Sequence, residues 1–163
     1  MIGARLSELL ATKWEDINFS TATWNFKTSL HLDKELRYYL DGTKTKASER
    51  KITLNKSILA LIRSLQKNSK SDFIFVSPLG DPFPNRTVLL KNFYKYMKKA
   101  DVKKIRFHDL RHSHVALLID MQEQDFIIKE RMSHASIKIT YDIYGHLFPS
   151  KHHELAEKLS SII

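Results

Sequence analysis

The strand-like segments of this sequence are confined to one short region, and helical patterns occupy the rest. The strand-like segments are rich in threonine, aromatic and β-branched side chains and lie at residues 21–29, 36–40 and 49–54. Asp41-Gly42 directly follows the second segment and is a strong signal for a hairpin turn. The pattern predicts one small three-stranded antiparallel sheet within residues 22–54.

Apolar side chains recur at helical spacing on both sides of that region. Before it, Leu6, Leu9 and Leu10 fall on one face of a helix expected over residues 4–13. After it, Ile58, Leu61, Ile62 and Leu65 recur at the same spacing in a helix expected over residues 56–66, and further helices are expected at residues 86–100, 109–120, 124–133, 136–144 and 150–161. We therefore expect an α+β fold that is mainly helical.

The composition narrows the class of protein. A chain of 163 residues fits one domain. With 27 Lys and Arg against 18 acidic residues, the formal net charge is +9, which favours a polyanionic partner such as nucleic acid. The absence of cysteine excludes disulfides, thiolate metal sites and a cysteine nucleophile. No apolar run is long enough to cross a membrane, and the first residues do not read as a secretory signal.

Two segments near the end of the chain hold residues suited to phosphate chemistry. His108 and Arg111 are three residues apart, so they share one face of a helix and could together bind a phosphate. Taken alone, this pair is better explained by a solvated helix end. Tyr144 and Tyr141 lie close to His134, but tyrosines at this spacing usually serve packing.

Two segments near the start carry further cations. Arg5 begins an amphipathic helix and could be a surface charge or could pair with Glu8. Lys44 and Lys46 flank the expected hairpin turn, where lysines are usually solvated. None of these residues is diagnostic by itself.

Taken in order, the four segments resemble the phage-integrase family of tyrosine recombinases. GARLSELLATKWEDIN is similar to the first-arginine box of that family, and TKTKASERKITL to the hairpin that carries its lysine. HDLRHSHVALL is similar to the His-x-x-Arg box, and MSHASIKITYDIYGHL to the closing box with the nucleophile. The resemblance runs from Gly3 to about Leu147. It departs where the family usually has Leu-Gly-His and this chain has Met132-Ser133-His134.

The resemblance implies a role for each matching residue. The implied catalytic residues are Arg5, Lys44, His108, Arg111, His134 and Tyr144. Tyr144 is the implied nucleophile, because it stands in the Tyr-x-His context of the family, and Tyr141 is its competitor. Lys46 is the fallback for Lys44. We also expect Lys46, Arg50 and Arg86 to contact the DNA backbone, because they lie in a hairpin and at a helix start.

The resemblance also implies a fold, an activity and partners. The fold is the helical catalytic domain of the DNA breaking-rejoining enzymes, over residues 1–163, truncated at its N-terminus and without the family's core-binding domain. The activity is site-specific recombination through a 3′-phosphotyrosyl bond, with no cofactor and no metal. The implied partners are double-stranded DNA and further copies of the protein, as a tetramer on DNA, in the cytoplasm of a prokaryote. The final segment, with Leu155, Leu159 and Ile162 in one stripe, packs either on a neighbouring protomer or on its own domain.

Three other readings stay open. A type IB topoisomerase shares this chemistry, although the match to the integrase boxes argues against it. A non-enzymatic DNA-binding remnant is disfavoured by the full set of six functional groups. A metal hydrolase is suggested by the eight histidines. The histidines lack carboxylate partners at ligand spacing, which argues against that reading.

Overall fold

The fold combines short helices with two small antiparallel sheets. The computed structural model describes residues 2–35, 37–42, 49–67, 69–77, 86–134, 136–148, 156–157 and 159–160. The helices are α1 Leu6–Ala11, α2 Lys56–Gln66, α3 Arg86–Lys99, α4 Asp109–Asp120, α5 Asp125–Met132 and α6 Ile137–Tyr144, with 3-10 turns η1 Trp14–Asp16 and η3 Gly145–Leu147. The strands are β1 Ile17–Asn18, β2 Thr23–Phe26, β3 Thr28–Leu32, β4 Tyr38–Gly42 and β5 Arg50–Thr53.

The predicted strand region forms two sheets rather than one. One sheet has the order β1-β2-β5, and the other is the β3-β4 pair. In the first, Trp24 lies opposite Ile52 and Phe26 lies opposite Arg50. All four side chains are buried, because alternate positions of a strand point to the same face. Lys27 interrupts the expected first strand, so that β2 and β3 pair with different partners.

The prediction of a hairpin turn at Asp41-Gly42 is wrong. These residues belong to β4, where they lie opposite Ser29 and Thr28. The turn of this hairpin begins at Asp33, whose Oδ1 accepts hydrogen bonds from the backbone N–H groups of Glu35 at 3.0 Å and Arg37 at 2.7 Å. An aspartate side chain that bonds its own following backbone stabilises such a turn.

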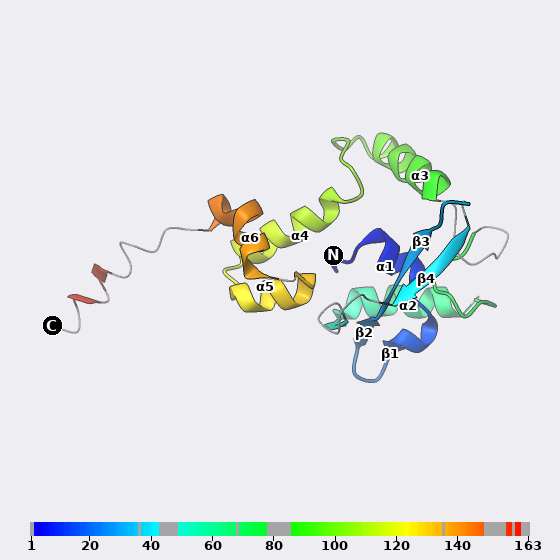
Figure 1. Ribbon diagram of the computed structural model, residues 1–163, viewed down its shortest axis with the longest axis horizontal. Coiled ribbons are helices and arrows are strands. Elements are labelled where there is room, and N and C mark those ends of the chain that lie inside the picture. The colour runs from blue at the N-terminus through cyan, green and yellow to red at the C-terminus, as the bar shows by residue number, and fades with distance from the viewer. Residues whose placement is uncertain are drawn as a thin grey trace.

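Helices α4, α5 and α6 form a second layer with its own core. Val115, Ile119, Ile128 and Met132 are buried together, and Tyr144 packs against them. Figure 1 shows these three helices grouped on one side of the molecule, the strands on the other, and α1 between them. The strands have a separate core, which is centred on Trp24, Phe26 and Ile52.

The helix positions follow the predicted ones closely. Helix α4 has the predicted bounds, α3 and α6 differ from theirs by one residue at one end, and α5 differs by one residue at each end. Of the final predicted helix, residues 156–157 and 159–160 are described and are helical, whereas Leu155 and Ile162 lie outside the described residues. Among the described residues, no helix is both long enough and apolar enough to span a bilayer.

Candidate active site

Arg5 is held at the start of α1 by the carboxylate of Glu8. The backbone N–H of Arg5 donates to Glu8 Oε2 at 2.7 Å, and its Nη1 donates to Glu8 Oε1 at 2.7 Å. A glutamate in the first turn that bonds back to the residue before the helix stabilises the helix start. The side chain of Arg5 keeps 42 % of its surface exposed, so its guanidinium remains available to a ligand.

Arg50 donates two hydrogen bonds to the same carboxylate. Arg50 Nη1 lies 2.9 Å from Glu8 Oε1, and Nη2 lies 2.7 Å from Glu8 Oε2. Burial raises the pKa of Glu8, but the hydrogen bonds and charge of Arg50, followed by the two bonds from Arg5, outweigh it and bring the pKa to about 2. Glu8 is therefore ionised and bridges two guanidiniums.

This burial changes the expectation for Arg50. Its place near a hairpin predicted a contact with the DNA backbone, whereas Arg50 is only 7 % exposed and directs its guanidinium at Glu8. The ion pair occupies both terminal nitrogens. This geometry supports a role in orienting Arg5 through Glu8, and the contact of Arg50 with the DNA backbone stays a prediction.

Arg111 lies behind Arg5 and is anchored by backbone oxygens. It is 5 % exposed and donates through Nη1 to the carbonyl of Gly3 and through Nη2 to the carbonyl of Met132. Burial lowers its pKa to about 10, and the neighbouring charges of Arg5 and Arg50 act in the same direction. The guanidinium is still charged at neutral pH. Its bonds to Met132 of α5 and to Gly3, three residues before α1, join three segments at one point.

Two unusual backbone positions create those carbonyl contacts. Gly3 has a φ of 69°, and a Cβ there would come within 2.5 Å of the His114 ring and 2.9 Å of Met132 Sδ, so only glycine fits. Ser133 ends α5 with a φ of 51° and a ψ of 48°. This left-handed position is where the resemblance predicted glycine, and serine adopts it here. The turn before His134 therefore forms without the glycine.

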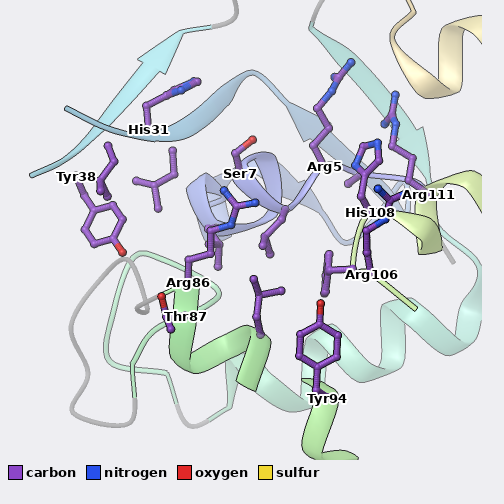
Figure 2. A pocket seen from close by; sticks show the side chains of 17 residues that line it. Arg5, Ser7, His31, Tyr38, Arg86, Thr87, Tyr94, Arg106, His108 and Arg111 are labelled. Atoms are coloured by element: carbon purple, nitrogen blue, oxygen red, sulfur yellow. The ribbon is translucent and has the colours of Figure 1, made fainter. Parts of the chain in front are cut away.

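Arg5, Arg111 and His108 meet at one end of a cavity of about 890 Å³. Figure 2 shows these three side chains beside one another, with Arg106 and Tyr94 below them and the His31 and Tyr38 side chains at the far end. Burial lowers the pKa of His108, and the charges of its histidine and arginine neighbours lower it further. Several cations around one hollow suit an anionic ligand.

His134 is oriented by a buried hydroxyl. Its Nδ1 lies 2.9 Å from Oγ1 of Thr140, which is fully buried on α6. Burial lowers the pKa of His134 to about 4, and the charges of Arg111, Arg5 and Arg50 lower it further. The imidazole is therefore neutral at physiological pH and keeps its second ring nitrogen, Nε2, for another partner.

The two candidate tyrosines have different surroundings. Tyr144 ends α6, is 7 % exposed, and its hydroxyl bonds Nδ1 of His112. Burial raises its pKa, whereas the Arg111 charge lowers it. Tyr141 is 43 % exposed, and its hydroxyl donates to Asp125. Tyr144 therefore adjoins the arginine cluster, and Tyr141 faces outward.

The sequence model of the phage integrase family matches residues 2–151. The chain belongs to the phage integrase family. It is 33 % identical over 180 residues to the ICEBs1 integrase of Bacillus subtilis, covering 100 % of this chain and 47 % of that protein. It is 27 % identical to the integrase of Staphylococcus phage L54a, covering 100 % of this chain and 50 % of that protein. The chain spans about half the length of these curated relatives.

Solved structures of a transposon integrase and of a recombinase have the same fold as this chain. The Tn1549 transposon integrase in complex with transposon right end DNA superimposes with a TM-score of 0.79 at 20 % identity, covering 99 % of this chain and 55 % of that one. The XerA recombinase superimposes with a TM-score of 0.69 at 19 % identity, covering 98 % of this chain and 52 % of that one. The mainly helical fold with small antiparallel sheets is therefore that of the phage integrase family.

The sequence of this phage integrase domain also predicted functional roles for Lys44, Lys46 and Arg86. Lys44 and Lys46 lie outside the described residues. Arg86 is exposed at the start of α3 and lines the same cavity as Arg5, so its DNA contact stays a prediction.

One functional contact was missed by sequence reasoning. His112 touches the Tyr144 hydroxyl, yet the sequence resemblance gave it no role. The available signal was its spacing: His112 follows His108 by four residues, which places both rings on the same side of α4.

Proposed function

We propose that this protein is a site-specific DNA recombinase that cleaves and rejoins strands through a 3′-phosphotyrosyl bond to Tyr144. One observation carries the proposal. The Arg5 and Arg111 guanidiniums and the His108 ring face one cavity, and the ring of His108 stacks edge-on with His112, which bonds the Tyr144 hydroxyl. Cationic groups and a phenol are thus gathered from segments far apart in the sequence.

The arginines supply what a phosphodiester needs for attack. Its anionic oxygens repel nucleophiles, and guanidiniums that bind the two non-bridging oxygens stabilise the charge that develops in the transition state. Arg5 has the exposure to reach one oxygen. We assign the other to Arg111 and expect the neutral ring of His134 to donate a hydrogen bond through Nε2.

The bond changes balance without a cofactor. The Tyr144 oxygen bonds to phosphorus, the bond from phosphorus to the deoxyribose 5′ oxygen breaks, and that oxygen leaves with a proton. We assign Lys44 as the proton donor, with Lys46 as the alternative. One phosphodiester replaces another, so the reverse attack by a 5′-hydroxyl restores intact DNA.

The partners follow from this chemistry and from the relatives. The solved structure of the Tn1549 transposon integrase contains that protein in complex with transposon right end DNA. The +9 charge of this chain supports backbone contacts with double-stranded DNA. Its curated relatives include integrases of a bacterium and of a phage. We therefore propose integration or excision of a mobile element in a prokaryotic cytoplasm, by a homo-tetramer that pairs two DNA sites.

Covalent capture tests the proposal. The protein is mixed with a library of nicked duplexes of random sequence, in which the short cleaved piece diffuses away and cannot rejoin. We expect wild type and Tyr141→Phe to form DNA adducts that survive denaturing gels, and Tyr144→Phe to form none. Capture by Tyr144→Phe at the wild-type level would contradict the assignment of the nucleophile.

A modified leaving group tests the acid. A 5′-thiol needs no proton to leave, so a bridging 5′-phosphorothiolate duplex should restore cleavage to Lys44→Ala if Lys44 protonates the leaving oxygen. The same duplex should leave Tyr144→Phe inactive. If Lys46→Ala is rescued and Lys44→Ala is not, the acid is Lys46.

A further inference from the structure

The Tyr144 phenol is in contact with an imidazole that the sequence resemblance gave no role. Nδ1 of His112 bonds the Tyr144 hydroxyl, and the two ring centroids lie 5.8 Å apart. His112 sits on α4 and Tyr144 on α6, so this contact joins the two helices beside Arg111. A phenol O–H that meets a ring nitrogen forms the arrangement expected of a nucleophile and its base.

The other two histidines of the site are directed elsewhere. His108 lines the cavity with Arg5 and Arg111, and its ring meets His112 edge-on with centroids 4.8 Å apart. His134 is bonded through Nδ1 to Thr140. His108 therefore faces the cavity, His134 is bonded to Thr140, and His112 faces the phenol.

We propose that His112 is a catalytic residue that removes the proton from Tyr144 during DNA cleavage. The inference rests on the proposed function and specifies how its nucleophile is activated. The Tyr144 O–H proton passes to Nδ1 of His112 as the phenolic oxygen bonds to phosphorus and the 5′ oxygen departs. When a 5′-hydroxyl attacks the phosphotyrosine, the His112 imidazolium returns the proton to the phenolic oxygen, so the cycle balances.

The surroundings of the phenol make such a base necessary. A free phenol has a pKa of about 10 and is protonated at neutral pH. Burial at Tyr144 makes loss of the proton harder, and Arg111 opposes that effect only in part. Nδ1 of His112 contacts this hydroxyl and can take its proton.

The test separates a base from a mere hydrogen-bond partner. The rate of covalent capture is measured with a nicked duplex recovered from the random library, for wild type, His112→Ala and His112→Gln. Glutamine can accept a hydrogen bond but cannot take a proton at neutral pH. The matched control is His146→Gln, which changes an exposed histidine two residues beyond Tyr144.

We expect both His112 variants to bind the duplex as wild type does and to capture it about 10²–10⁴-fold more slowly. Added imidazole should recover part of the rate of His112→Ala, and such rescue also shows that the variant is folded. His146→Gln should capture at the wild-type rate.

Two results would overturn the inference. A wild-type rate for His112→Gln would reduce His112 to a positioning contact. Faster capture by His112→Ala would mean that His112 restrains the phenol instead of activating it. Failure of the proposed function looks different, because wild type itself would then capture no DNA, or Tyr144→Phe would capture it.

Discussion

Arg50 spans the carboxylate of Glu8 with both terminal nitrogens, at 2.9 Å and 2.7 Å, while Arg5 takes one of the same oxygens at 2.7 Å. The pair connects β5 to α1 over 42 residues of sequence. The direction in which Arg5 points therefore depends on a residue of the first sheet. A buried carboxylate between two guanidiniums fixes geometry more strongly than a surface ion pair does.

Replacing Arg50 should damage stability and Arg5 together. Arg50→Ala leaves the buried Glu8 with half of its partners, and breaking a buried pair costs about 3–5 kcal/mol. Urea unfolding measures the loss, and capture of nicked DNA should slow as well. The control is Lys51→Ala, an exposed neighbour on the same strand, which should stay within about 0.5 kcal/mol of wild type. Equal stability of the two variants would mean that the Glu8–Arg50 pair contributes little.

Gly3 should not tolerate a side chain. Alanine would have to adopt a φ of 69°, and its Cβ would meet the His114 ring at 2.5 Å. Overpacking of this kind costs about 1–3 kcal/mol. Because the Gly3 carbonyl accepts from Arg111, we also expect Gly3→Ala to weaken binding of DNA. Thermal unfolding and gel shifts measure the two effects. Alanine at exposed Gly42, where a Cβ meets no atom within 4 Å, is the control.

Acid should destabilise the fold in two overlapping pH windows. Burial lowers the pKa of both His114 and His134 from 6.5 to about 4. Between these values the unfolded chain binds protons that the folded chain does not, so stability falls as the pH drops from 6.5 to 4. The pKa of Glu8 is about 2 instead of 4.5, so its contribution is present above pH 4.5 and is lost as the pH falls towards 2.

The variant His134→Gln tests the upper window. Each histidine adds a slope of up to about 1.4 kcal/mol per pH unit, so this variant should flatten the stability curve between pH 6.5 and 4. It should leave the decline below pH 4 unchanged. Urea unfolding at a series of pH values gives the curve. An unaltered slope in the upper window would show that His134 is not held neutral by burial.

Local patterns predicted the helices well and the strand pairing poorly. The helix α4 has its predicted bounds, because a helix is held by hydrogen bonds between residues four apart and local sequence can indicate it. Asp41-Gly42 misled the pairing, since a two-residue signal is weaker than the register of β3 against β4. The turn instead begins at Asp33, whose side chain accepts a hydrogen bond from the backbone of Arg37. A single aspartate is a less specific sequence signal than Asp-Gly.

Sequence motifs identified some residues of the candidate site. They did not identify residues whose role depends on packing against distant parts of the chain. Arg5, His108 and Arg111 meet at one cavity as the resemblance implied. Arg50 could not be separated from a surface arginine by its neighbours in sequence, because its burial depends on Glu8, 42 residues away. His112 was missed for the same reason: its partner is on another helix.

The most direct measurement locates the covalent bond. DNA adducts of the wild-type protein are digested with nuclease and trypsin, and the peptide 139–151, which holds both Tyr141 and Tyr144, is fragmented in a mass spectrometer. We expect the nucleotide mass on Tyr144. A nucleotide on Tyr141, on a residue outside this peptide, or on no residue at all would contradict the central claim.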